Sequence, residues 1–235
     1  MSATLYLVGV GTGDPELLTL KAVRILGAAK VIAFPQKAGK SSLSYRIAKD
    51  HLNPKAELFA ADIPMSTDRA PAQAAYDVLA LRISEYLTAE KSVAYLCEGD
   101  PLYYGSAMYL IDRLVQEFEI KIIPGITSLT ASAAAIRRPI AARNDVLKVL
   151  PALLDDARLI AELEGAEAVA IIKIGRHFGR IRTLLEQSGH AENAMLIEHA
   201  SSDQQIVMPL RDCASDARPY FSTVLCYAGG EAWAK

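Results

Sequence analysis

Residues 96–106 read Leu-Cys-Glu-Gly-Asp-Pro-Leu-Tyr-Tyr-Gly-Ser, a stretch in which two glycines and a proline surround the carboxylate of Asp100. The apolar run at residues 92–95 is typical of a buried strand, and the amphipathic pattern at residues 106–118 is typical of a helix. The stretch therefore marks a turn from a strand to a helix around Asp100. In an open α/β sheet, loops at the carboxyl ends of strands line the crevice where ligands bind. Taken alone, however, the stretch favours a tight turn without a ligand.

The bulk composition is that of a globular protein. The chain has 235 residues, of which 51% are hydrophobic and 22% charged, so it can form one large or two small domains. Its net charge of −2 disfavours nucleic acid and anionic membranes as partners. The start of the chain lacks signal-peptide features, and no apolar run is long enough to span a bilayer. We therefore expect a cytoplasmic protein that does not insert into membranes.

Cysteine usage bears on the redox compartment and on metal binding. Cys97, Cys213 and Cys226 lie far apart in the sequence and lack CxxC spacing. This pattern disfavours both a disulfide framework and a structural zinc site, and it suits a reducing compartment. We expect no metal site built by the protein itself.

A second glycine-rich turn lies near the start of the chain. Residues 9–16 read Gly-Val-Gly-Thr-Gly-Asp-Pro-Glu and follow a strand pattern at residues 5–10. The G-x-G-x-G-D spacing differs from the G-x-G-x-x-G of dinucleotide-binding folds. Asp14 is a natural N-cap, and Pro15 suits the first position of a helix. A ligand cradle and a simple turn are equally open interpretations here.

A third sharp turn follows the strand pattern at residues 119–123. Residues 124–130 read Pro-Gly-Ile-Thr-Ser-Leu-Thr, and Thr127 or Ser128 is positioned to cap a small-residue helix at residues 129–136. Close packing alone is a sufficient reason for the alanines of that helix.

The rest of the chain alternates strand and helix patterns. Further strands are expected at residues 30–35, 57–59, 146–150, 168–174, 195–197, 205–208 and 222–227. Further helices are expected at residues 17–26, 72–89, 153–163 and 178–187, and residues 36–44 are expected to form a loop. The alternation in the first half predicts a largely parallel sheet. We expect an α/β protein of two domains, residues 1–120 and 121–235, with a cleft between them.

In this order and at these separations, the three turns resemble those of the tetrapyrrole methylase family. Its members use S-adenosylmethionine to methylate the corrin precursor ring. The resemblance covers nearly the whole chain, and residues 97–110 with Lys-Ile-Gly-Arg-His at 173–177 are most similar to the precorrin-2 C20-methyltransferases of cobalamin biosynthesis. It implies two αβα domains, an S-adenosylmethionine cofactor in the cleft between them, a tetrapyrrole substrate and a homodimer.

The resemblance also implies which residues contact the cofactor. Thr12 lies in the first turn, at a position where the family usually has proline. The methionine portion is expected at Glu98, Gly99, Asp100, Tyr103, Thr127 and Ser128, largely through main-chain groups. Ile174 is expected on one side of the adenine and Ala200 on the other. Glycines permit close approach to such a ligand, and a carboxylate near the sulfonium is chemically suitable.

The substrate implied by the resemblance carries many carboxylates, so cations are expected around it. The candidates are Arg143, Lys37 and Arg176, although such residues are more often only solvated. Lys40, Arg69 and His177 are weaker candidates. A general base is left open among Glu98, Tyr103, Tyr104 and His199. A methylase acting on another ring position and a non-catalytic sensor with the same cleft are the alternative functions.

Overall fold

The computed structural model describes residues 3–64, 68–214 and 218–228. The chain divides into two compact units, Met1–Thr127 and Ser128–Lys235. Strand β5 (Glu119–Ile123) pairs with β1 (Thr4–Gly9), so it belongs to the first unit. A division after residue 120 would cut this strand, and the observed division follows it instead.

The first unit contains a sheet of five parallel strands in the order β3-β2-β4-β1-β5. The remaining strands of this sheet are β2 (Val31–Gln36), β3 (Glu57–Asp62) and β4 (Val93–Cys97). Leu7 at the centre of β1 pairs with Tyr95 on one side and Ile122 on the other. The parallel sheet expected from the alternation of patterns is confirmed.

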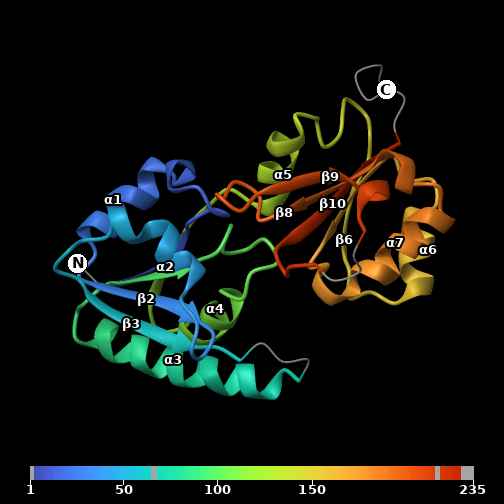
Figure 1. Cartoon of the computed structure of the whole chain (residues 1–235). Coiled ribbons are helices and arrows are strands. Elements are labelled where there is room, and N and C mark those ends of the chain that lie inside the picture. Colours follow the sequence, from blue (N-terminus) through green and yellow to red (C-terminus); the bar gives the residue numbers. More distant parts are fainter. Residues whose placement is uncertain (1–2, 65–67, 215–217, 229–235) are drawn as a thin grey trace. The chain divides into compact units, whose positions relative to one another are not determined.

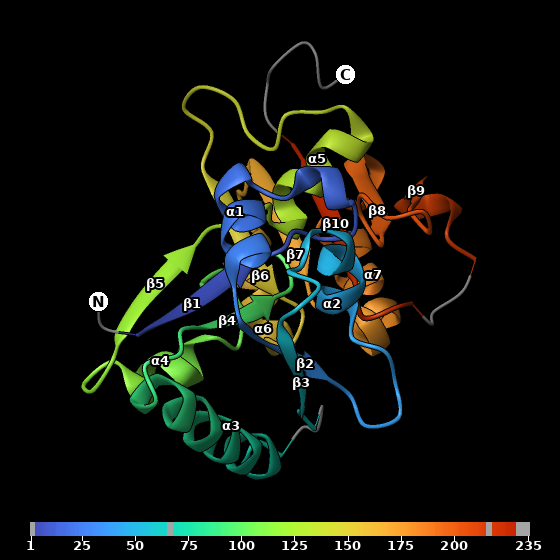
Figure 2. The same cartoon turned by 90° about the vertical axis from the view of Figure 1, so that its left-hand side faces the viewer.

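Helices cover both faces of this sheet (Figure 1 and Figure 2). The helices α1 (Leu20–Ala28) and α2 (Leu43–Ala48) lie on one face, and α3 (Ala70–Thr88) and α4 (Met108–Leu114) lie on the other. Because side chains alternate along a strand, Leu96 of β4 packs toward α1 and α2 while Tyr95 packs toward α3 and α4. Burying a leucine such as Leu96 contributes about 1.5–3 kcal/mol.

Helix α2 lies partly in the segment that we expected to be a loop, residues 36–44. Its N-cap is Ser42, whose hydroxyl accepts a hydrogen bond from the Tyr45 N–H at 3.3 Å. The helix has only six residues, too few for a helical period to stand out in the sequence. It packs on β2 and β4, so tertiary contacts stabilise it.

The expected helix at residues 17–26 is divided in two. Asp14 accepts a hydrogen bond from the Glu16 N–H at 2.8 Å and begins a 3₁₀ turn, as expected, with Pro15 at its first position. The chain then leaves the helical conformation at Leu18, and Thr19 caps α1 by accepting a hydrogen bond from the Ala22 N–H at 3.1 Å. The second cap explains why α1 starts later than the sequence pattern indicates.

The second unit contains a mixed sheet in the order β6-β7-β10-β8-β9. Its strands are β6 (Leu147–Pro151), β7 (Ala168–Ile172), β8 (Ala194–Glu198), β9 (Ile206–Pro209) and β10 (Ser222–Tyr227). β10 is antiparallel to both β7 and β8, so these two strands point the same way. Their carboxyl ends therefore lie at the edge of the sheet where β10 begins.

Helices also cover both faces of the second sheet. The helix α5 (Ser128–Ile136) packs on β8 and β10, while α6 (Asp156–Leu163) and α7 (Phe178–Gln187) pack on the other face (Figure 1). Short 3₁₀ helices occur at η1 (Pro15–Leu17), η2 (Lys49–His51), η3 (Gly175–His177), η4 (Ala191–Asn193) and η5 (Leu210–Asp212). Within the described residues, none of the helices is both long and apolar enough to cross a membrane.

Candidate functional site

The three glycine-containing turns of the sequence lie together in the first unit. The sheet order makes β4, β1 and β5 neighbours, so the turns at their carboxyl ends adjoin. The Val10 N–H donates to the Cys97 carbonyl at 2.9 Å. Gly11 and Gly99 exchange two backbone hydrogen bonds, at 3.2 and 2.7 Å, and so extend the contact beyond the strands.

Glycine is required in these turns because the backbones are in contact. A Cβ atom on Gly125 would lie 2.1 Å from the Gly99 carbonyl oxygen, and one on Gly9 would lie 2.6 Å from the Gly125 nitrogen. Both distances are shorter than any side chain tolerates. Gly99 also has a φ of +65°, which glycine adopts readily. We call Gly9, Gly11, Gly99 and Gly125 the glycine layer.

Asp100 connects the turn after β4 to the turn after β5. Its Oδ1 accepts a hydrogen bond from the Leu102 N–H at 2.9 Å, and its Oδ2 accepts one from the Gly125 N–H at 3.1 Å. The carboxylate therefore fixes the shape of the two turns. Thr12 follows Gly11 in the same group of turns, and Thr127 follows the turn after β5.

The Glu98 side chain faces α2. It continues the alternation of β4, in which Ala94 and Leu96 pack toward α1 and α2. Burial raises the pKa of Glu98, and the nearby Arg46 guanidinium and the Ser44 N–H oppose that shift. The Glu98 side chain is thus held between the sheet and α2, an element that the sequence did not predict.

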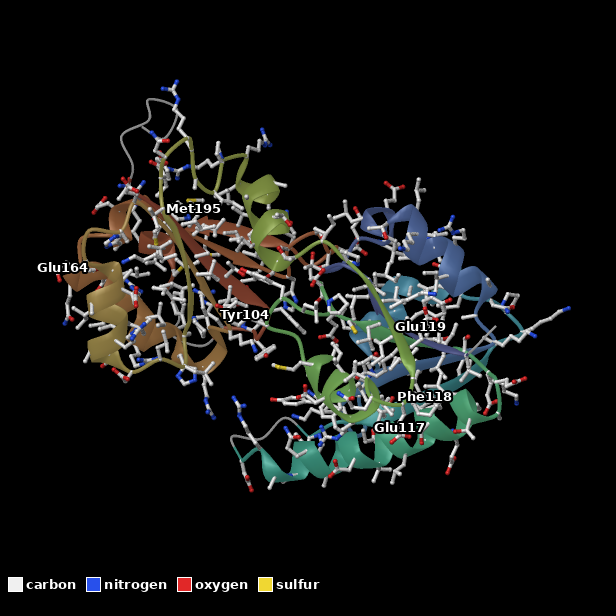
Figure 3. All side chains as sticks on the ribbon, turned by 180° about the vertical axis from the view of Figure 1, so that it is seen from behind. Tyr104, Glu117, Phe118, Glu119, Glu164 and Met195 are labelled. Carbon is white, nitrogen blue, oxygen red and sulfur yellow. The ribbon has the colours of Figure 1, made fainter. Side chains whose placement is uncertain are left out.

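Tyr103 and Tyr104 form the outer part of the turn after β4. Their rings meet edge to face with centroids 5.2 Å apart, and Tyr104 has a φ of +53°, which is uncommon for a bulky residue. Figure 3 shows Tyr104 on the loop between β4 and α4. The Tyr103 hydroxyl is buried and has no hydrogen-bond partner among the described residues. A buried hydroxyl without a partner is unfavourable, so it is suited to a polar ligand group.

The residues expected around the adenine follow two strands of the second unit, β7 and β8, that flank β10. Ile174 follows β7 and Ala200 follows β8, and both are buried. The His199 N–H donates to the Phe221 carbonyl at 2.9 Å, and a Cβ on Gly175 would lie 3.6 Å from the Cα of Tyr220. The segments at residues 173–178, 198–201 and 218–222 therefore meet at one edge of the sheet. We call them the three wall segments.

Backbone strain is concentrated in these wall segments. Lys173, His199 and Ser201 have φ values of +59°, +47° and +67°. Non-glycine residues in this conformation are uncommon and often lie at functional sites. The strain marks this edge of the second sheet as a candidate binding site.

The expected substrate cations do not all lie together. Lys37 is exposed in the first unit, and Arg176 is exposed in the second unit, next to Ile174. Arg143 precedes β6, where Asp145 accepts a hydrogen bond from the hydroxyl of Tyr227, the last residue of β10, at 2.7 Å. Arg143 is thus at the opposite end of the second sheet from Arg176. A five-residue strand separates the two ends by about 16 Å.

The described residues provide no obvious metal site. Within residues 3–64, 68–214 and 218–228, no three His, Cys, Asp or Glu side chains are grouped so as to hold an ion. Cys97, Cys213 and Cys226 are buried and free.

The family of the chain follows from its sequence. Residues 4–213 match the model of the Tetrapyrrole (Corrin/Porphyrin) Methylases. The chain therefore belongs to this family of S-adenosylmethionine-dependent methyltransferases.

Individual relatives have more specific names. The chain is 38% identical over 226 residues to a precorrin-2 C(20)-methyltransferase of Sinorhizobium sp, covering 93% of this chain and 92% of the relative. It is 30% identical over 228 residues to the cobalt-precorrin-2 C(20)-methyltransferase of Salmonella typhimurium, covering 96% of each. It is also 37% identical to the cobalamin biosynthesis protein CobIJ of Mycobacterium tuberculosis, covering 96% of this chain but only 46% of that relative. The chain thus spans about half the length of CobIJ.

Solved structures share the fold. A cobalt precorrin-4 methyltransferase matches with a TM-score of 0.73 and 20% identity, covering 98% of this chain and 95% of its own. The uroporphyrin-III C-methyl transferase of Thermus thermophilus, complexed with S-adenyl homocysteine, matches with a TM-score of 0.70 and 22% identity over 95% of this chain and 97% of its own. The expected fold class, with two αβα domains, is confirmed.

Proposed function

We propose that the chain is an S-adenosylmethionine-dependent methyltransferase that adds a methyl group to C20 of precorrin-2 or its cobalt complex in cobalamin biosynthesis. The observation that carries this proposal is the similarity along nearly the full length of both proteins to the Sinorhizobium precorrin-2 C(20)-methyltransferase, at 38% identity. The Salmonella cobalt-precorrin-2 enzyme supports the same ring position at 30% identity.

In this proposal, the glycine layer and the turn after β4 bind the methionine portion of the cofactor. The close approach of three backbones leaves main-chain groups, rather than side chains, to contact a ligand. The Tyr103 hydroxyl, which lacks a partner among the described residues, supplies a further polar contact. Glu98, Gly99, Asp100, Thr12, Thr127 and Ser128 complete the proposed set. Asp100 contributes by fixing the turn.

The wall segments of the second unit bind the adenine in this proposal. Ile174 and Ala200 are both buried and apolar, and they follow strands whose carboxyl ends lie at the same edge. A flat aromatic base requires apolar surfaces on its faces and backbone groups at its rim. The wall segments combine such apolar residues with backbone in an uncommon conformation at Lys173, His199 and Ser201.

Catalysis in this proposal depends on alignment. The bound cofactor supplies an electrophilic methyl group on sulfur, and the protein holds an electron-rich ring carbon in line with it while excluding water. Such positioning contributes about 7–11 kcal/mol in favourable systems. Lys37 and Arg176 are proposed to contact substrate carboxylates. Arg143 remains a separate candidate at the other end of its sheet.

The proposal is tested by binding and by turnover. Isothermal titration of the pure protein should show S-adenosylhomocysteine binding with micromolar or tighter affinity. Incubation with cofactor and precorrin-2, or its cobalt complex, should then increase the substrate mass by one methyl group, and NMR should locate that group at C20. Methylation of uroporphyrinogen III instead would indicate another methylase of the family. Cofactor binding without turnover of either substrate would indicate a sensor.

We also propose that the protein is a cytoplasmic homodimer, as the family resemblance implies. The chain mass is 25.4 kDa, so light scattering after size exclusion should give about twice this value. A mass equal to that of one chain, at micromolar concentration, would reject the dimer.

A further inference from the structure

Arg218 lies where the three wall segments of the second unit meet. Its Nη1 is 3.3 Å from Oε1 of Glu198, the last residue of β8. Its guanidinium carbon is 5.0 Å from the ring centroid of Phe178, the first residue of α7. The Arg218 and Glu198 side chains are only 12% and 4% exposed. The pair is therefore a buried ion pair, with an aromatic ring next to the cation.

The ion-pair partner of Arg218 and the ring beside its guanidinium both belong to wall segments. Phe178 follows the turn that carries Ile174, Glu198 precedes Ala200, and Arg218 itself precedes Tyr220 and Phe221. One guanidinium group thus contacts two wall segments from its position on the third. No sequence motif marked Arg218, because its partners are far away in the chain.

The chemistry of this contact makes it sensitive to substitution. A buried charge that loses its partner is left in a poorly solvated site, so the local structure must rearrange. A lysine keeps the charge but lacks the planar guanidinium that stacks on a ring and reaches a carboxylate. The Arg218 Nε is buried without a hydrogen-bond partner among the described residues, so the contacts with Glu198 and Phe178 are important for holding this side chain, and its charge also acts on the nearby Cys213 thiol.

We propose that Arg218 is a positioning residue, which holds the three wall segments at the separation that an adenine ring requires. The inference rests on the proposed function, because it assigns the wall segments to the adenine of S-adenosylmethionine. Arg218 acts through Ile174 and Ala200, and it need not contact the ligand itself.

The experiment compares Arg218→Met, Arg218→Lys and Glu198→Gln with the control Arg180→Met. Arg180 joins α7 to α6 through Asp156 and the Leu154 carbonyl, and its charge acts on His177, so this control removes a cation near the wall segments while the Arg218–Glu198 pair stays in place. Titrations use S-adenosylhomocysteine and 5′-methylthioadenosine, which has the adenine but no amino-acid tail. Melting temperatures are measured in parallel.

We expect Arg218→Met to raise the Kd of both ligands at least tenfold. Arg218→Lys and Glu198→Gln should raise the Kd less than Arg218→Met does, and each should affect the two ligands by a similar factor. The control should lower the melting temperature with less than a twofold change in Kd. In turnover assays, the KM for S-adenosylmethionine should rise while kcat at saturation changes less than threefold. If Arg218→Met does not fold, the affinities of Arg218→Lys and Glu198→Gln test the positioning role of Arg218.

The outcomes separate the two proposals. If the wild-type protein does not bind S-adenosylhomocysteine, the proposed function fails and the inference fails with it. If the wild type binds and the folded Arg218 and Glu198 variants bind as tightly as the Arg180→Met control, the function stands and Arg218 has no positioning role. The inference would also be overturned if the variants lost affinity for S-adenosylhomocysteine but kept wild-type affinity for 5′-methylthioadenosine, because the adenine is common to both ligands.

Discussion

At the scale of single residues, Asp100 acts by holding the shape of two turns, and substituting it tests how far cofactor binding depends on that shape. Its carboxylate accepts hydrogen bonds from Leu102 and Gly125, so Asp100→Ala leaves two N–H groups without their partner. We expect a loss of about 1–3 kcal/mol in the free energy of unfolding. The turn after β4 should loosen, and the Kd of S-adenosylhomocysteine should rise by about tenfold, which corresponds to about 1.4 kcal/mol.

The matched control for Asp100 is Asp155→Ala. Asp155 accepts a hydrogen bond from the Arg158 N–H at 2.8 Å as the N-cap of α6. Losing this cap costs about 1 kcal/mol of stability and should leave ligand affinity unchanged. Titration calorimetry and chemical denaturation of both variants give the comparison. A well-folded Asp100→Ala protein with wild-type affinity would reject the role of Asp100 in cofactor binding.

Glu98 should make stability depend on pH. Burial raises its pKa above the ordinary value of 4.5, against the opposing effects of Arg46 and the Ser44 N–H. A group with a raised folded-state pKa contributes stability that is fully present below its unfolded pKa and lost as the pH rises through the folded one. Glu98→Gln removes this loss, so the variant should gain stability relative to wild type as the pH rises from 4.5.

Melting temperatures from pH 4.5 to 8 test this expectation for Glu98. Glu85→Gln, at an exposed position on α3, measures the effect of removing a surface charge. A stability difference between wild type and Glu98→Gln that stays constant over this range would show that burial of Glu98 does not penalise its charge.

At the scale of elements, the glycine layer explains why three turns from separate parts of the chain form a set. Gly125→Ala would place a Cβ 2.1 Å from the Gly99 carbonyl oxygen, backbone against backbone. We expect a loss of about 3 kcal/mol or more in stability, or no folding, because moving either backbone apart would break the hydrogen bonds between Gly99 and Gly11 or between Gly125 and Asp100. Urea denaturation measures the loss.

Gly39→Ala is the control for the glycine layer. Gly39 has a φ of +72°, but a Cβ there would meet nothing within 4 Å. Only the strain of the left-handed conformation applies, which costs about 1–2 kcal/mol. Equal losses for Gly39→Ala and Gly125→Ala would mean that the close contact in the glycine layer is relieved by relaxation.

Local sequence patterns predicted the elements better than their arrangement. Each of the ten described strands overlaps a predicted one, because apolar runs and turn residues are local signals. Helix α2 was missed because it is short and stabilised by tertiary packing. The insertion of β10 between β7 and β8 depends on pairing between distant segments, which no local pattern encodes.

For the candidate site, the sequence indicated the turns but not the contacts between them. The sequence marked Gly99 and Gly125 as parts of tight turns, because such turns require glycine. The family resemblance suggested Ile174 and Ala200, which follow strands that end at one edge of the second sheet and stay predictions as adenine contacts. The connection of Asp100 to Gly125 and the position of Arg143 at the far end of its sheet were not predictable, since both depend on strand order.

At the scale of the whole molecule, the cofactor assignment names residues in both units, and hydrogen exchange can test each unit separately. Saturating S-adenosylhomocysteine at about 100 times its Kd stabilises a binding protein by about 2.7 kcal/mol. We expect slower amide exchange at residues 97–105 of the first unit and at residues 173–178 and 198–201 of the second. The last turns of α3, residues 80–88, lead to the amino end of β4, opposite the turn after β4, and should exchange as in the free protein. Mass spectrometry of proteolytic peptides resolves these segments. Protection confined to the first unit would remove Ile174 and Ala200 from the cofactor site, and protection confined to the second would remove the glycine layer.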